Sequence, residues 1–141
     1  MNNIERFLSY FADYDHKTAL ILNNRNYSYN WILERIEYWS YILSEEGIEK
    51  SVVGFQGDYL PEIIALFFAL MRLKNILVPL GVINQQEQKR YFDIANLRYI
   101  LSIDKQEKLV IQDLKTIIDN TTLSQFMKEE SAGIILFSSG S

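Results

Sequence analysis

The sequence has 141 residues, of which 48% are hydrophobic and 13% aromatic, and its 14 basic and 18 acidic residues give a net charge of −4. This composition is typical of one globular domain, and the acidic balance argues against a nucleic-acid or anionic-membrane partner. The absence of cysteine excludes a disulfide framework and thiolate chemistry. The longest apolar run, residues 63–71, is too short to span a membrane, and the N-terminus lacks the pattern of a secretory signal, so we expect a cytoplasmic protein.

The first predicted elements are a hairpin and a helix. Residues 18–22 form a strand candidate, and a polar turn leads to a second short strand at residues 27–29. Residues 30–46 follow with apolar side chains at helical spacing, namely Ile32, Ile36, Trp39 and Leu43. Ser28 or Asn30 is suited to cap the start of this helix.

After this helix, strands and helices alternate. Strands are expected at residues 51–56, 76–80 and 99–103, more weakly at 109–111, and as a short buried strand at 134–137. Helices are expected at residues 59–73, where Asp58 is suited to cap the start, at residues 84–96, and after Thr122. The pattern predicts an α/β fold over residues 1–141: a mostly parallel sheet with helices on both faces, preceded by a β-hairpin.

The last four residues, Ser138, Ser139, Gly140 and Ser141, are the strongest candidate binding residues. Hydroxyls and a glycine directly after an apolar strand present backbone N–H groups and side-chain oxygens toward one point, which is one way to hold a phosphate. Serine and glycine are also ordinary turn residues, so the composition by itself leaves both interpretations open. No Walker A pattern is present. We expect the chain to be the truncated front of a larger nucleotide-using enzyme, ending inside its phosphate loop.

Four weaker candidates have simpler structural explanations. Gly54 and Gly57 lie between a strand and a helix but lack the full dinucleotide fingerprint. His16 has acidic neighbours but no second histidine or cysteine, so a solvated loop explains it better than a metal site. Three glutamates at a helix end most simply form a hydrated face: Glu45, Glu46 and Glu49. Six aromatic residues form either a binding surface or core and rim: Tyr27, Tyr29, Trp31, Tyr38, Trp39 and Tyr41. No catalytic residue and no metal ligand is predicted within the chain.

Three segments, in order, resemble blocks of the AMP-forming adenylating superfamily, which contains acyl-CoA synthetases, adenylation domains of nonribosomal peptide synthetases and luciferases. Residues 27–33 (Tyr-Ser-Tyr-Asn-Trp-Ile-Leu) resemble the early Leu-Thr/Ser-Tyr-x-Glu-Leu block. Residues 69–80 resemble the block Leu-Lys-Ala-Gly-x-x-Tyr-Val-Pro-Leu-Asp, and residues 135–141 resemble the opening of the phosphate loop, Tyr-Thr-Ser-Gly-Ser/Thr-Thr-Gly-x-Pro-Lys. The likeness extends over nearly the whole chain.

The sequence departs from the family pattern at three positions inside or beside these blocks. Trp31 stands where the first block has glutamate, Lys74 replaces the glycine of the second block, and Gly81 follows where aspartate is usual. The phosphate loop lacks its Thr-Gly-x-x-Lys half. These differences bear on the subfamily and leave the likeness to the superfamily intact.

The resemblance implies a two-step ligase. Such an enzyme uses ATP and Mg²⁺ to convert a carboxylic acid to an acyl-adenylate, and then passes the acyl group to a thiol of coenzyme A or a carrier protein. It also implies that Ser138, Ser139, Gly140 and Ser141 contribute to holding the β- and γ-phosphates, while the adenine pocket, acyl pocket, Mg²⁺-binding glutamate and catalytic lysine lie downstream. We therefore expect this chain alone to be inactive, to bind no cofactor tightly, and to self-associate through an exposed apolar face. The alternative is a naturally small, flavodoxin-like α/β binding or interaction domain without catalysis.

Overall fold

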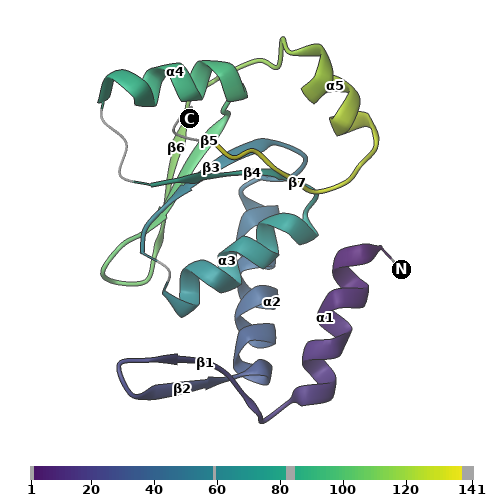
Figure 1. Cartoon of the computed structure of the whole chain (residues 1–141), viewed down its shortest axis with the longest axis vertical. Coiled ribbons are helices and arrows are strands. Elements are labelled where there is room, and N and C mark those ends of the chain that lie inside the picture. The colour runs from purple at the N-terminus through teal and green to yellow at the C-terminus, as the bar shows by residue number, and fades with distance from the viewer. Residues whose placement is uncertain (1, 59, 82–84, 138–141) are drawn as a thin grey trace.

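The computed structural model describes residues 2–58, 60–81 and 85–137. Within these residues the chain forms a two-stranded antiparallel sheet and a five-stranded sheet of order β6-β5-β3-β4-β7 (Figure 1). The elements in chain order are α1 (Asn3–Tyr14), β1 (Thr18–Leu22), β2 (Arg25–Ser28), α2 (Tyr29–Glu45), β3 (Val52–Gln56), α3 (Pro61–Arg72), β4 (Ile76–Leu80), α4 (Gln85–Ala95), β5 (Tyr99–Ile103), β6 (Leu109–Asp113), α5 (Thr121–Lys128) and β7 (Gly133–Ile134). The predicted α/β fold with a preceding hairpin is confirmed.

Helix α1 was not predicted from the sequence. The side chain of Asn2 caps it by accepting a hydrogen bond from the Glu5 backbone N–H at 2.9 Å. Its buried residue is Leu8, and Phe11 packs edge-on against Phe68 of α3 with ring centroids 5.6 Å apart. The sequence does carry a signal for this helix, because Ile4, Leu8 and Phe11 recur at helical spacing on one face, and the prediction overlooked it.

The hairpin turn is tighter than predicted. Asn23 and Asn24 both have positive φ, 49° and 62°, as a two-residue hairpin turn with right-handed twist requires. Strand β2 therefore begins at Arg25, inside the segment predicted as turn, and pairs with Leu22 of β1. This pairing brings Arg25 into the strand, where it becomes part of the site described below.

Helix α2 begins and ends as its sequence predicts. The Ser28 Oγ accepts a hydrogen bond from the Trp31 backbone N–H at 3.0 Å, so Ser28 is the cap and Asn30 is not. Gly47 follows the helix with φ +70°, a conformation that glycine adopts without a steric penalty. The four buried residues of α2 are the four that the periodicity identified: Ile32, Ile36, Trp39 and Leu43.

The large sheet is covered by helices on both faces, as predicted. Along β3 and β4, successive side chains point to opposite faces of the sheet. Val53 and Leu77 belong to one apolar cluster, and Val52 and Val78 belong to the other. One cluster contains residues of α1, α2 and α3, and the other contains residues of α4 and α5, so the sheet lies between the two helical layers (Figure 1). Gly54 of β3 faces the second layer, where an added Cβ would lie 2.7 Å from Leu80 Cδ1.

One buried side chain links the elements before β3 and β4. Asn75 is fully buried, and its Oδ1 accepts a hydrogen bond from the Ser51 backbone N–H at 3.0 Å. Its Nδ2 donates to the carbonyls of Leu70 and Ile48 at 3.1 and 3.3 Å. Because every polar atom of the amide has a backbone partner, Asn75 fixes the end of α3 against the start of β3.

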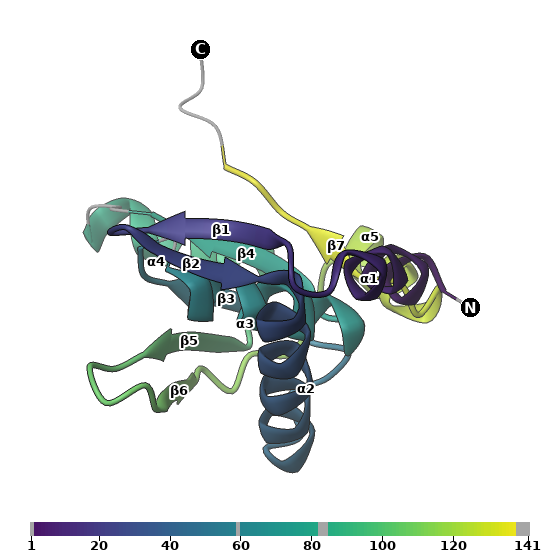
Figure 2. The same cartoon turned by 90° about the horizontal axis from the view of Figure 1, so that it is seen from below.

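The two edges of the sheet differ in direction. Strands β3, β4, β5 and β7 run parallel, whereas β6 pairs antiparallel with β5 (Figure 2). The predicted strand at 134–137 is assigned as strand only at its start, in β7, and the prediction that it is buried is wrong. Ile134 and Leu136 are 48% and 74% exposed, whereas Ile135 and Phe137 pack against the second helical layer. The reason is that the segment is packed on one face and only partly covered on the other, so its side chains alternate between core and solvent.

Candidate functional site

The connections of the sheet define where a ligand site is expected. Helix α3 connects β3 to β4 over one face, and α4 then leads back over the other face to β5, on the far side of β3. Strands β3 and β5 are therefore neighbours whose connecting helices lie on opposite faces. In open α/β sheets, ligands bind in the crevice at the carboxyl ends of the strands at this kind of switch point.

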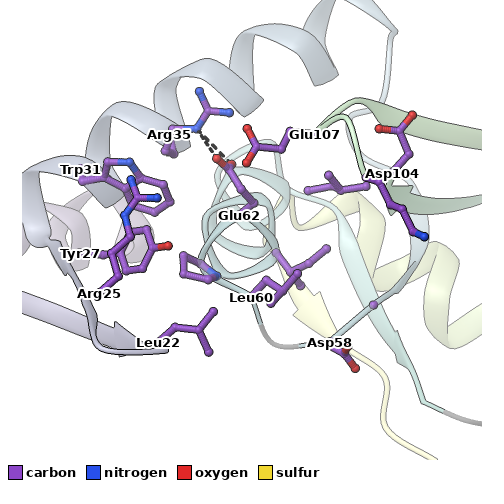
Figure 3. A pocket seen from close by; sticks show the side chains of 15 residues that line it. Leu22, Arg25, Tyr27, Trp31, Arg35, Asp58, Leu60, Glu62, Asp104 and Glu107 are labelled. Atoms are coloured by element: carbon purple, nitrogen blue, oxygen red, sulfur yellow. Dashed lines mark hydrogen bonds and ion pairs between the residues drawn. The ribbon is translucent and has the colours of Figure 1, made fainter.

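A cavity of about 640 Å³ lies at this switch point. Its lining comes from three regions: the hairpin with the first turns of α2, the loop between β3 and α3 with the start of α3, and the turn between β5 and β6. The volume falls within the range of roughly 300–1,000 Å³ that is usual for small-molecule pockets. Figure 3 shows that the hairpin side and the strand-end side of the cavity carry different chemistry.

The hairpin side is aromatic and basic. The Arg25 guanidinium lies 4.9 Å from the centroid of the Tyr27 ring, and the rings of Tyr27 and Trp31 meet at 62° with centroids 4.7 Å apart (Figure 3). Among the described residues, no carboxylate forms an ion pair with Arg25. The tight turn before β2 and the Ser28 cap bring these three side chains together, because they place β2 and the start of α2 along the same rim.

The floor of the cavity contains an ion pair with a structural role. Glu62 of α3 accepts a hydrogen bond from Arg35 Nε at 3.0 Å (Figure 3). It also accepts one from the Trp39 indole N–H at 2.7 Å. The Arg35 guanidinium also lies 4.1 Å from the centroid of the Tyr38 ring. The carboxylate of Glu62 is thus engaged by two donors of α2, so it joins α2 to α3 and is not free for proton transfer.

The strand-end side of the cavity is acidic. Asp58 follows β3, while Asp104, Lys105 and Glu107 lie in the turn after β5. Asp104 Oδ1 accepts hydrogen bonds from the backbone N–H groups of residues 106 and 108, both at 2.9 Å, and so shapes the turn. Asp58 was predicted as a helix cap, but that prediction is wrong: residue Leu60 is at the cap position of α3 and no side chain caps it.

The predicted phosphate-binding residues Ser138, Ser139, Gly140 and Ser141 lie outside the described residues. The described chain up to Phe137 is fixed at two points. The Ile135 backbone N–H donates to the Leu77 carbonyl at 2.8 Å. The Phe137 ring stacks on Tyr91 of α4, with centroids 4.2 Å apart and planes at 24°.

The weaker sequence candidates have structural roles or lie in solvent. Gly54 is inside β3 and is required by side-chain packing, which explains it without a dinucleotide site. His16 is 89% exposed and contacts the carboxylate of Asp15 at 2.9 Å. Within residues 2–58, 60–81 and 85–137, no three His, Cys, Asp or Glu side chains are grouped to hold a metal ion, and no helix is long and apolar enough to cross a membrane. Glu45, at the end of α2, and Glu46 and Glu49, which follow it, are exposed, as expected.

Of the predicted aromatic surface, only Tyr27 and Trp31 line the cavity. Trp39 is core, and Tyr41 is 64% exposed on α2. Arg25 was not identified from the sequence, because its importance depends on the position of the hairpin across the end of the sheet. The available signal was the Asn-Asn pair, which by itself predicts a two-residue turn and places the next residue in a strand.

At the opposite end of the strands, three charged residues tie the sheet together. Glu130, just before β7, accepts hydrogen bonds from Lys50 Nζ at 2.6 Å and Lys74 Nζ at 3.1 Å. The hydrogen bonds and positive charges of the two lysines lower the pKa of Glu130 below its ordinary value of 4.5. The same hydrogen bond and charge raise the pKa of Lys50.

Comparison with solved structures identifies the fold. The N-terminal subdomain of NpsA from Klebsiella oxytoca superposes with a TM-score of 0.71 at 22% identity, covering 99% of this chain and 38% of that one. NpsA in complex with 3-hydroxyanthranilyl-AMSN gives a TM-score of 0.68 at 19% identity, covering 98% and 29%. VinN in complex with L-aspartate gives 0.64 at 13% identity, covering 96% and 32%. No protein-family model matches the sequence, and no curated protein matches it either.

The chain therefore has the fold of the N-terminal subdomain of an adenylation domain. NpsA also forms part of an artificially fused adenylation–PCP di-domain, which matches with a TM-score of 0.66 at 15% identity. The chain spans between 22% and 38% of the length of these solved chains. At such low identity the likeness concerns the fold, and what the whole protein does is a separate question.

Proposed function

We propose that this chain is the N-terminal part of an AMP-forming ligase that activates a carboxylic acid with ATP and transfers it to a thiol. The observation that carries the proposal is the superposition of 99% of the chain on the NpsA N-terminal subdomain. The three family-like segments support it independently. Residues 27–33 join β2 to α2, residues 69–80 join α3 to β4, and residues 135–141 follow β7.

In this proposal Ser138, Ser139, Gly140 and Ser141 bind the β- and γ-phosphates of ATP. Serine hydroxyls and consecutive backbone N–H groups suit this role, since they are donors that offset phosphate charge. When bound, Mg²⁺ supplies further charge neutralisation between phosphate oxygens. The described residues offer no cluster of carboxylates for that ion. The family resemblance implies that its protein ligands lie in the remainder of the enzyme.

The acid and the acceptor are proposed by class. NpsA was solved with 3-hydroxyanthranilyl-AMSN and VinN with L-aspartate, which makes aromatic acids and amino acids the first substrates to test. The adenylation–PCP fusion of NpsA makes a carrier-protein thiol a candidate acceptor beside coenzyme A. We place the enzyme in the cytoplasm, where ATP and both thiol acceptors are available.

The test is the ATP–pyrophosphate exchange reaction. The gene is first sequenced beyond the codon for Ser141, and its full product is then assayed with a panel of aromatic acids and amino acids. We expect the frame to continue through Thr-Gly-x-x-Lys and the product to exchange pyrophosphate only when its acid is present. A stop codon after Ser141, or no exchange with any acid by a folded full product, would overturn the proposal.

The 141-residue chain is the matched control in the same assay. We expect it to show no exchange, because the proposed adenine and acyl pockets belong to other residues of the enzyme. Exchange by this chain alone would contradict the proposed division of the site. Thioester formation, followed by mass spectrometry with coenzyme A and with a phosphopantetheine-bearing carrier protein, distinguishes the two acceptors.

A further inference from the structure

We propose that the cavity at the β3–β5 switch point binds a planar aromatic monocarboxylate, at a site separate from the proposed phosphate loop. This site was not anticipated from the sequence motifs, and it does not depend on the adenylation proposal. The two sites are carried by different strands. The cavity lies between the ends of β3 and β5, whereas the phosphate-loop residues follow β7, which is separated from β3 by β4.

The aromatic part of the ligand follows from the walls of the cavity. Tyr27 and Trp31 form one wall, and Leu60, just before α3, contributes an aliphatic side chain to the lining (Figure 3). Pro61 also lines the cavity. Leu60 is 46% exposed although it is apolar, so its side chain is available to cover a ring. A flat ring between aromatic and aliphatic side chains gains both apolar burial and ring–ring contact.

The carboxylate follows from Arg25. Its guanidinium is held over the Tyr27 ring at 4.9 Å and is without a carboxylate partner among the described residues. The other arginine in the cavity, Arg35, is already paired with Glu62 at 2.9 Å. A planar guanidinium binds a carboxylate through two parallel hydrogen bonds, and the ring beneath it restricts its orientation.

The single charge of the ligand follows from the other wall. With Arg35 and Glu62 neutralising each other, the remaining charged groups of the lining are Arg25 and Lys105 against Asp58, Asp104 and Glu107. The lining is therefore slightly negative. This lining repels a nucleotide with two or more phosphate charges more strongly than a monoanion, whose one carboxylate is compensated by its contact with Arg25. An amino group on the far side of the ring would face the carboxylates, so amino-substituted rings should bind more tightly.

The experiment uses the 141-residue chain and the indole N–H signals of its two tryptophans in ¹H–¹⁵N NMR spectra. Trp31 lines the cavity, so its signal reports ligand at the aromatic wall, while the Trp39 indole N–H donates to Glu62 and reports ligand that disturbs the cavity floor. Loss of one signal in Trp31→Phe assigns it. We expect benzoate to shift the Trp31 signal saturably and 4-aminobenzoate to do so at lower concentration, with cyclohexanecarboxylate and AMP far weaker.

The decisive variant is Arg25→Gln, with Arg6→Gln on exposed α1 as its control. Loss of a charged hydrogen-bond pair should raise the dissociation constant for 4-aminobenzoate by about 10- to 100-fold. Arg6→Gln should leave that constant unchanged. The proposal is overturned if the Trp31 signal shows no saturable shift up to about 10 mM ligand. It is also overturned if Arg25→Gln binds 4-aminobenzoate with unchanged affinity, or if AMP binds more strongly than 4-aminobenzoate. Because this assay uses neither ATP turnover nor downstream chain, its failure leaves the pyrophosphate-exchange result unaffected, and the reverse also holds.

Discussion

Lys74 provides a direct test of how this chain departs from the family pattern. It stands where the resembling block has glycine, and it follows α3 with φ +59°. Its backbone N–H donates to the Met71 carbonyl at 3.0 Å, as expected for a left-handed residue that ends a helix. A residue with a Cβ is strained in this conformation by about 1–2 kcal/mol, whereas glycine is not. Lys74 therefore adopts a glycine-like backbone at an energetic cost.

The informative comparison is between Lys74→Gly and Lys74→Ala. Both variants lose the contact with Glu130, so the difference between them reports the backbone alone. The greater freedom of unfolded glycine offsets about 0.5–1 kcal/mol of the released strain, which leaves Lys74→Gly more stable than Lys74→Ala by about 0.5–1 kcal/mol. With about 2.1 cal/mol/K of unfolding entropy per residue, this corresponds to a Tm about 2–3 °C higher for a chain of this length.

The assay is thermal unfolding followed by circular dichroism, with urea unfolding to give the free-energy difference at constant temperature. The control repeats both substitutions at Lys89, an exposed residue inside α4. There the order should reverse, because glycine inside a helix is about 1 kcal/mol less favourable than alanine. If Lys74→Gly unfolds at or below the temperature of Lys74→Ala, the argument from backbone strain is refuted.

Three further predictions concern other parts of the fold. Asn75→Ala should lower the free energy of unfolding in urea by about 2–4 kcal/mol, because three hydrogen bonds to backbone groups are lost, while the exposed Asn26→Ala should change it by less than about 0.5 kcal/mol. Because the folded pKa of Glu130 is lowered below 4.5, its contribution to stability is complete above that pH and is lost as the pH falls through the folded pKa. Glu130→Gln should therefore melt below the unchanged protein at pH 7, and the two curves should converge in acid; an equal gap at pH 7 and at pH 3 would contradict this. Leu136→Asp should reduce self-association measured by sedimentation velocity, because the apolar Leu136 side chain is 74% exposed. The control Gln112→Asp, at another exposed position, should leave self-association unchanged. If the unchanged protein is monomeric at high concentration, the prediction of self-association is wrong.

Much of the fold follows from local signals in the sequence. The buried stretches of β3 and β4 are continuous apolar runs, a sequence pattern typical of strands that are covered on both faces. The cap at Ser28 and the positive φ at Gly47 mark both ends of α2. These predictions succeeded because each depends on residues within a few positions of one another.

One error arose where a neighbour distant in the sequence decides the outcome. Residues 134–137 form an apolar run like that of β3, yet Ile134 and Leu136 are exposed because the described chain covers that face of the segment only in part. An apolar run indicates that a strand is suited to burial, but the helices that bury it are found elsewhere in the chain. Helix α1 is a different case, because Ile4, Leu8 and Phe11 gave a local signal at helical spacing that the prediction overlooked.

The cavity at the switch point depends most strongly on long-range arrangement. Arg25, Asp58 and Lys105 come from three separate parts of the chain, and no spacing in the sequence relates one to another. What brings them together is the reversal of strand order around β3, combined with a hairpin that lies across the same end of the sheet. The reversal of strand order depends on which face of the sheet each connecting helix covers. It can therefore be predicted only after the two apolar clusters have been assigned to opposite faces. A motif search can therefore find a candidate phosphate loop, which is contiguous, and overlook this cavity, which is not.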